Sequence, residues 1–130
     1  MAYSCAMSQA RLKVTVVPQY LEDQSQPAMG VYAFSYAVTV TNIGDVAAQV
    51  IGRHWVITDN TNRVEEVRGL GLVGHQPLIQ PGGEFNYSSW TQLATPQGTM
   101  HGEFFCVTED MQFFETVIEP FALVRTQSLH

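Results

Sequence analysis

The stretch from Val31 to Thr41, VYAFSYAVTVT, alternates large and small side chains over its whole length. Its even positions hold the large ones, Tyr32, Phe34, Tyr36, Val38 and Val40. Because successive side chains of a β-strand point to opposite faces, this pattern predicts a strand whose even positions face the core. Asn42-Ile43-Gly44-Asp45, which follows, is typical of a turn.

Shorter segments of the same kind recur along the chain, at residues 12–17, 47–58, 63–68, 85–92, 99–107 and 112–119. Clusters of Gly, Pro, Asn and Asp separate them, and no window of ten residues has a helical period. A length of 130 residues and 45% hydrophobic residues suit one folded domain, residues 1–130, and exclude intrinsic disorder. The pattern predicts an all-β domain of about seven or more strands, a sandwich or a barrel.

Charge and targeting signals exclude several functional classes. The chain has a formal net charge of −6, and its basic residues number 6 against 12 acidic ones, without a basic cluster. Nucleic-acid binding depends on such clusters, so we expect no nucleic-acid partner. No secretory signal or membrane-length apolar stretch is present, and Cys5 and Cys106 match no disulfide or metal pattern. We therefore expect a cytoplasmic protein without direct membrane insertion.

Residues Gly69 to Gly74 match the phosphate-binding pattern GxGxxG. A dinucleotide site is excluded, because Pro77 and Pro81 prevent the helix that must follow and no acidic residue lies about twenty positions on. Two interpretations remain. The backbone at Gly69, Gly71 and Gly74, with Arg68 beside it, forms a loop that binds a phosphate-containing small molecule. Alternatively, the glycines only provide the backbone angles of a sharp connection.

Two aromatic pairs, Phe104-Phe105 and Phe113-Phe114, lie inside predicted strands, so one member of each pair must leave the core face. With a loop at Thr108–Met111, Phe105 and Phe114 lie opposite each other. An exposed aromatic pair on a sheet indicates an interface with a protein partner, or a homo-oligomer. The alternative is that a loop or the N-terminal segment covers the pair.

Candidate catalytic and metal-ligating residues are sparse. His54, His75, His101 and His130 have no metal-ligand spacing, and Ser88-Ser89 lies outside a nucleophile-elbow motif. Glu65 and Glu66 point to opposite faces of a strand, and Cys106 is interpreted as a small core residue. We expect neither a catalytic residue, nor a metal site, nor a cofactor, and hence no enzymatic activity.

Several segments together resemble the bacterial ApaG family, also called CorD, over nearly the whole chain. The similar segments are residues 20–25, 34–44, 53–59, 66–67, the 69–74 loop, 76–78, 81–82, 95–100 and 120–121. The resemblance implies an immunoglobulin-like or fibronectin type III-like β-sandwich. It also implies an association with cobalt resistance and magnesium efflux, without an established activity, and related eukaryotic domains resemble protein-interaction modules. Leu70 departs from the Glu or Pro that the family pattern leads us to expect.

Overall fold

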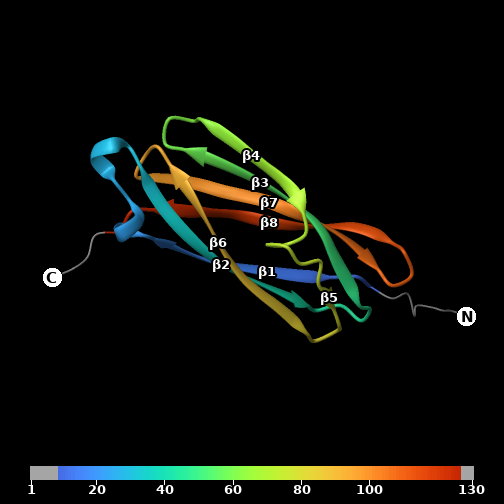
Figure 1. The fold of residues 1–130 in the computed structure, drawn as a ribbon. Coiled ribbons are helices and arrows are strands. Elements are labelled where there is room, and N and C mark those ends of the chain that lie inside the picture. Colours follow the sequence, from blue (N-terminus) through green and yellow to red (C-terminus); the bar gives the residue numbers. More distant parts are fainter. Residues whose placement is uncertain (1–8, 127–130) are drawn as a thin grey trace, which may run out of the picture.

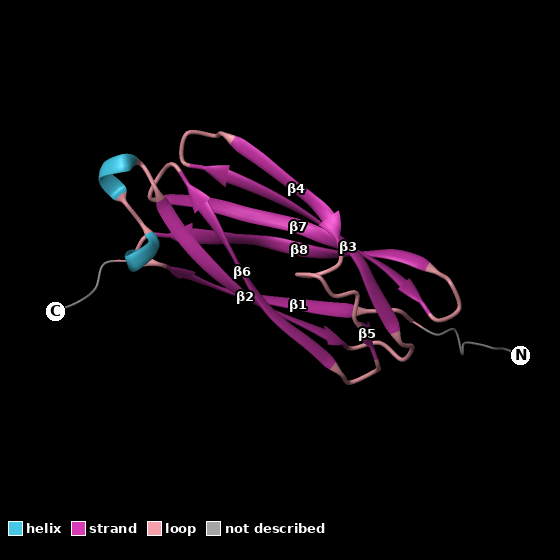
Figure 2. Cartoon of the chain, in the orientation of Figure 1, coloured by secondary structure: helices cyan, strands magenta, loops and turns pink. Residues whose placement is uncertain are grey.

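The structure is a computed structural model and describes residues 9–126 of the chain. Within these residues the chain forms eight strands and two short 3-10 helices (Figures 1 and 2). The strands are β1 (Leu12–Tyr20), β2 (Tyr32–Asn42), β3 (Ala48–Asp59), β4 (Val64–Leu70), β5 (Leu78–Ile79), β6 (Glu84–Leu93), β7 (Gln97–Thr108) and β8 (Phe113–Val124). The helices, η1 (Glu22–Gln24) and η2 (Pro27–Met29), connect β1 to β2. All seven predicted strands are present, and β5 is the short one that the sequence pattern did not predict.

The strands form two antiparallel sheets that pack face to face as a sandwich, which confirms the predicted fold class (Figure 1). A three-stranded sheet has the order β1-β2-β6, and a five-stranded sheet has the order β4-β3-β7-β8, with β5 also paired to β3. The fold is an immunoglobulin-like or fibronectin type III-like β-sandwich. Among the described residues, no helix has the length and apolar character needed to cross a bilayer.

Two prolines lie inside strands, at positions where the missing N–H removes no hydrogen bond to the neighbouring strand. Pro18 is opposite Tyr36 in the β1–β2 pair, and Leu21 N–H donates to Ala33 O in the same register. Since hydrogen-bonded pairs alternate along an antiparallel ladder, the nitrogen of Pro18 points to the free edge of β1. Pro120 lies where the β7–β8 register shifts, between the pairs Met100–Phe121 and Gly102–Ile118. Both strands therefore continue past residues that often end a strand.

Trp55 lies at the centre of the core, with only 2% of its surface exposed. Its ring meets the ring of Tyr36 from the opposite sheet at a centroid distance of 5.5 Å, and the rings of Phe104 and Phe121 from its own sheet at 6.0 and 6.1 Å. All three contacts are edge-on, the geometry that aromatic quadrupoles favour. The indole thus joins β2, β3, β7 and β8 in one packed cluster.

The two tryptophans provide a matched test of this packing, because Trp90 on β6 is 62% exposed. We expect Trp55→Ala to lower the free energy of unfolding by about 3–5 kcal/mol, since it leaves a large cavity between the sheets. Trp90→Ala should change it by no more than about 0.5 kcal/mol. Urea unfolding followed by circular dichroism measures both values. Equal destabilisation by the two variants would show that the core is not centred on Trp55.

Candidate interaction site

The glycine-rich segment contains a tight turn at its centre. Leu72 N–H donates to His75 O at 2.6 Å, and His75 N–H donates to Leu72 O at 3.1 Å. The two residues between them, Val73 and Gly74, have φ angles of +51° and +84°. Positive φ at both central residues defines a type I′ turn, which Gly74 adopts without strain but a β-branched residue such as Val73 rarely does.

The side chain of Arg53 on β3 holds this segment in place through hydrogen bonds to its backbone. Its Nη1 atom donates to the carbonyl oxygens of Leu70 and Gly71, both at 3.0 Å. A Cβ atom on Gly69 would lie 2.7 Å from the same nitrogen, so a glycine is needed for the guanidinium to approach. The cation thus binds the carbonyl side of the segment.

Two backbone N–H groups of the segment, those of Gly71 and Leu72, and that of His75 beside it donate hydrogen bonds within the chain. Gly71 N–H donates to Ile51 O at 2.6 Å, in addition to the two donors of the tight turn. A phosphate cradle needs several free N–H groups that converge on one point. Arg68 lies on the outer face of β4, where its Nη2 atom is 3.6 Å from Glu66 Oε1. These contacts favour the structural interpretation of the glycines, and the phosphate-binding loop stays a prediction.

A row of residues across the five-stranded sheet joins this segment to the aromatic strands. Leu70 lies opposite Gly52, and Gly52 lies opposite Phe105, so Leu70 and Phe105 share the outer face. Ile51 is the extra residue of a β-bulge between Val50 and Gly52. It lines a mainly apolar pocket of about 270 Å³ with Phe105, Cys106, Phe113, Phe114 and Glu115. We call Ile51, Leu70, Phe105 and Phe113 the Leu70–Phe113 surface.

The expected pairing of Phe105 with Phe114 is wrong. Thr108 N–H donates to Gln112 O, so the hairpin loop is Glu109–Met111 and is one residue shorter than the expected 108–111. This change of register places Glu115 opposite Phe105 and Cys106 opposite Phe114. Phe114 consequently packs against the core, and Phe113, with 77% of its surface exposed, is the aromatic that shares the outer face with Phe105.

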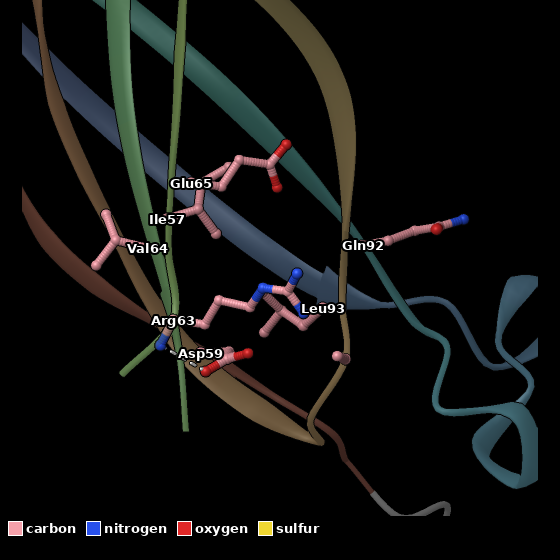
Figure 3. A pocket seen from close by; sticks show the side chains of 8 residues that line it. Ile57, Asp59, Arg63, Val64, Glu65, Gln92 and Leu93 are labelled. Atoms are coloured by element: carbon pink, nitrogen blue, oxygen red, sulfur yellow. Dashed lines mark hydrogen bonds between the residues drawn. The ribbon is translucent and has the colours of Figure 1, made fainter. Parts of the chain in front are cut away.

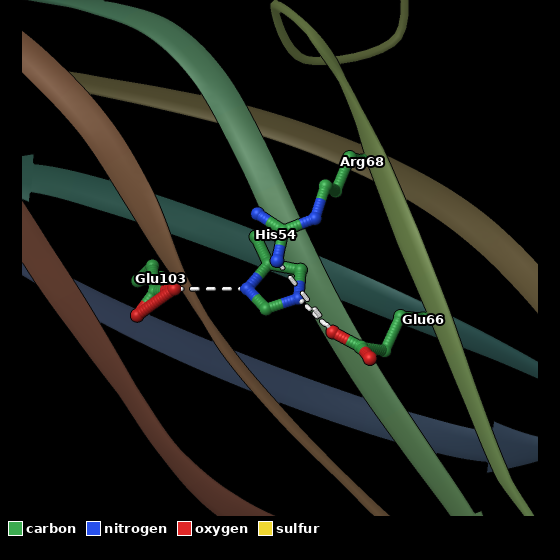
Figure 4. Close-up of polar contacts among 4 residues, drawn as sticks. All are labelled: His54, Glu66, Arg68 and Glu103. Atoms are coloured by element: carbon green, nitrogen blue, oxygen red, sulfur yellow. Dashed lines mark hydrogen bonds and ion pairs between the residues drawn. The ribbon is translucent and has the colours of Figure 1, made fainter.

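Further along the outer face of the same sheet, a histidine lies between two carboxylates (Figure 4). His54 Nδ1 is 2.9 Å from Glu103 Oε1 on β7, and its Nε2 atom is 2.8 Å from Glu66 Oε1 on β4. These carboxylates, Glu103 most strongly, accept hydrogen bonds from the ring and so raise the pKa of His54 above its ordinary value, although desolvation and the charge of Arg68 oppose the shift. Only the imidazolium form can donate from both nitrogens at once, which makes this cluster a three-strand ion pair.

The other candidate ligands do not assemble. Among residues 9–126, no group of three or more His, Cys, Asp or Glu side chains is arranged to hold a metal ion. The ring of His75 packs 5.8 Å from that of Phe85. Cys106 is buried, and burial raises the pKa of its thiol to about 11. Cys5 and His130 lie outside the described residues.

The His54 cluster predicts a pH dependence of stability. The folded-state pKa lies above the unfolded value, about 6.5, so the stabilisation is fully present below that pH and is lost as the pH rises through the folded-state pKa. We expect His54→Gln to lower the melting temperature at about pH 6 and to have a smaller effect at about pH 9. Thermal unfolding against pH measures this, with His101→Gln as the control on the same sheet face. A pH-independent effect of His54→Gln would contradict the charged cluster.

Comparison with known proteins agrees with the geometry. The family model described as DUF525, ApaG domain, matches residues 22–108. Protein ApaG of Ralstonia nicotianae is 52% identical over 124 residues, which are 95% of this chain and 100% of that protein. Protein ApaG of an Acidovorax species is 53% identical over 88% of this chain and 84% of its own length. A crystal structure described as the ApaA protein of Bordetella pertussis superposes with a TM-score of 0.89 at 49% identity, and covers 92% of this chain and 97% of that one. The chain belongs to the ApaG domain family.

Proposed function

We propose that this chain acts in the cytoplasm as a single-domain, non-enzymatic binding module whose partner is a protein. The observation that supports this proposal best is the Leu70–Phe113 surface. Leu70 and Phe113 are 78% and 77% exposed, and they flank Phe105 and Ile51 on one face. Monomeric proteins seldom leave large apolar side chains grouped in this way unless the group contacts another molecule.

The surroundings of this surface are suited to protein recognition. Apolar and aromatic side chains lie at the centre, and charged residues lie around it: Glu115 opposite Phe105, Glu109 and Asp110 in the hairpin loop, and Arg68 beside Leu70. A desolvated apolar centre with a polar rim is the usual anatomy of a protein–protein interface. The acidic rim favours a partner with basic residues around an apolar contact and disfavours nucleic acid.

The candidate chemical groups support a non-enzymatic role. A thiol with a pKa of about 11 in a buried position is a poor nucleophile at neutral pH. Both ring nitrogens of His54 are engaged by carboxylates, so neither is available to move a proton to a substrate. These properties support binding, rather than catalysis, as the proposed function.

The association with cobalt resistance and magnesium efflux, which the family resemblance implies, fits such a module only indirectly. The described residues contain no cluster that could carry a metal ion, so we propose that a partner protein handles the metal. In this proposal the chain regulates or assembles that partner. The partner at the Leu70–Phe113 surface can also be a second copy of this chain, which would make the protein a homo-oligomer.

A phosphate- or nucleotide-binding role at Gly69, Gly71 and Gly74 with Arg68 is the alternative. Its support is the exposure of the Arg68 side chain, 67%, beside a segment rich in positive φ angles. Its weakness is the engagement of three backbone N–H groups and the presence of the Arg53 guanidinium on the carbonyl side. We therefore rank it below protein binding.

The proposed function predicts that Phe113→Ser removes partner capture and leaves the fold intact, since the side chain is exposed. Val17→Ser is the matched control, because Val17 is 61% exposed on the outer face of the other sheet. Immobilised wild-type and variant proteins are compared for the proteins they retain from a bacterial extract, by quantitative mass spectrometry. A central aromatic contact contributes about 2 kcal/mol or more, so true partners should fall about 30-fold on Phe113→Ser alone. The proposal fails if Phe113→Ser and Leu70→Ser retain the same proteins as wild type.

A further inference from the structure

Of the four sheet edges, the one at β6 has the fewest charges and prolines, the residues that normally protect an edge. The edge at β4 carries Glu65, Glu66 and Arg68, and the edge at β8 carries Glu115, Glu119 and Pro120. The edge at β1 contains Lys13 and Pro18, and β1 lies against β8. Charges and prolines of this kind discourage another chain from pairing. In β6, the one charged residue is Glu84 at the start of the strand; residues 85–93 (FNYSSWTQL) contain no charge and no proline, and their register with β2 has no bulge.

The register identifies which backbone groups of β6 point to the open side. In β2, the odd-numbered Ala33 accepts a hydrogen bond from Leu21, just after the end of β1, and the even-numbered Asn42 donates one to Gly83, just before the start of β6. Because the bonding direction alternates along a strand, the odd residues of β2 bond to β1 and the even residues bond to β6. Their partners in β6 are the odd residues, such as Ser89 and Thr91. The N–H and C=O groups of Ser88, Trp90 and Gln92 consequently face away from β2. Among the described residues, no hydrogen bond engages these outward groups.

The space beside the free edge of β6, which faces the inner side of β4 in the other sheet, is not filled by another strand within residues 9–126. At the opposite side of the sandwich, β1 packs against β8. The three strands β1-β2-β6 then lie opposite a row of four, β8-β7-β3-β4, so no strand of the described chain covers the inner face of β4, the last strand of that row. No residue of β4 is buried. A pocket of about 450 Å³ opens here, lined by Ile57, Asp59, Arg63, Val64, Glu65, Gln92, Leu93 and Ala94 (Figure 3). The inner face of β4 therefore has room for one further strand in the three-stranded sheet.

We propose that an extended segment of a partner protein pairs with β6 at Ser88, Trp90 and Gln92 and becomes the fourth strand of the three-stranded sheet. The free backbone groups require an occupant with an extended backbone. A second copy of this chain fits less well. Pairing of its β6 with β6 of the first copy would bring the five-stranded sheet of the second copy toward the space that β4 of the first copy occupies. The outer side chains of the segment flank the exposed ring of Trp90, which favours apolar residues there. The inner ones face a pocket with two carboxylates, Asp59 and Glu65, and one guanidinium, Arg63, which favours a basic residue.

This inference rests on the proposed function in one respect, that the partner is a protein, and it uses a different surface. The probe is the synthetic peptide acetyl-Lys-Val-Thr-Val-Lys-Val-Thr-amide, which alternates apolar and basic or polar side chains. Two control peptides replace the central Val by Pro, or both Lys by Glu. Since the test does not use the Leu70–Phe113 surface, loss of partner capture by Phe113→Ser and failure of peptide binding can be observed independently.

Amide hydrogen exchange, measured by NMR on the labelled full chain, reads the pairing residue by residue. Without peptide, the amides of Ser88, Trp90 and Gln92 should exchange quickly, and those of Ser89 and Thr91 slowly, because only the latter bond to β2. Saturating peptide should slow exchange at Ser88, Trp90 and Gln92 by about tenfold or more, and the Pro peptide should not. The proposal is overturned if no saturable protection develops at millimolar peptide, or if protection develops on β4 instead. It is also overturned if these amides become protected with rising protein concentration alone, which identifies a second copy as the occupant.

Variants of the edge separate backbone pairing from side-chain contact. Ser88→Pro removes an outward N–H, a change that an edge strand tolerates, and should weaken peptide binding about tenfold or more. Trp90→Lys adds a charge to the edge and should also weaken peptide binding. If Ser88→Pro does not fold, the affinity of Trp90→Lys for the peptide is the deciding measurement. Val17→Lys, on the same sheet face and similarly exposed, should leave binding unchanged. Full binding by Trp90→Lys would contradict the assignment.

Discussion

The packing of Trp55 between the two sheets is the contact on which the rest of this structure depends. Its ring meets Tyr36 from the three-stranded sheet, and Phe104 and Phe121 from the five-stranded sheet. With Trp55 turned inward, the pleat of β3 turns His54 and Gly52 outward. The register then places Glu66 and Glu103 beside His54, and Leu70 and Phe105 on either side of Gly52. Both outer-face features therefore follow from the orientation of one core residue.

The unequal number of strands in the two sheets has a consequence for binding. Four long strands lie in one sheet and three in the other, within the described part of the chain, and β4 has no strand opposite it. The fold is closed where β1 meets β8 and open where β6 and β4 end their sheets. Charged side chains, such as those on β4, normally protect an open edge from pairing with another chain. The β6 edge, which has no charge or proline from Phe85 to Leu93, is the exception on which the inference of strand pairing is based.

Much of the fold could be predicted from the sequence, because strand alternation is a local property. The even positions of β2 were predicted to face the core, and Phe34, Tyr36, Val38 and Val40 are all buried. The register of the β7–β8 hairpin could not be obtained in this way, since one residue more or less in the loop decides whether Phe113 or Phe114 is exposed. The His54 cluster was also missed, because its partners lie 12 and 49 positions away in sequence. A polar residue beside an inward-facing tryptophan was the one available signal.

The glycine segment shows how a motif can match a pattern without its usual physical setting. Gly71 and Gly74 are needed for positive φ angles, and Gly69 for the close approach of Arg53. The motif thus encodes a braced turn that presents Leu70 and Val73 to the surroundings, where they are 78% and 54% exposed. The proposal that the partner is a protein, rather than a phosphate-containing small molecule, depends on this role of the glycines.

The most direct measurement is an amide NMR titration of the labelled protein with pyrophosphate and with ATP, each with and without Mg²⁺. If the glycines only shape the turn, no saturable shift is expected at Gly69, Gly71 or Gly74 up to millimolar ligand, because the N–H groups of Gly71, Leu72 and His75 already donate hydrogen bonds within the chain. Saturable shifts centred on residues 69–74 would contradict this role of the glycines and would make the phosphate-binding function the leading one.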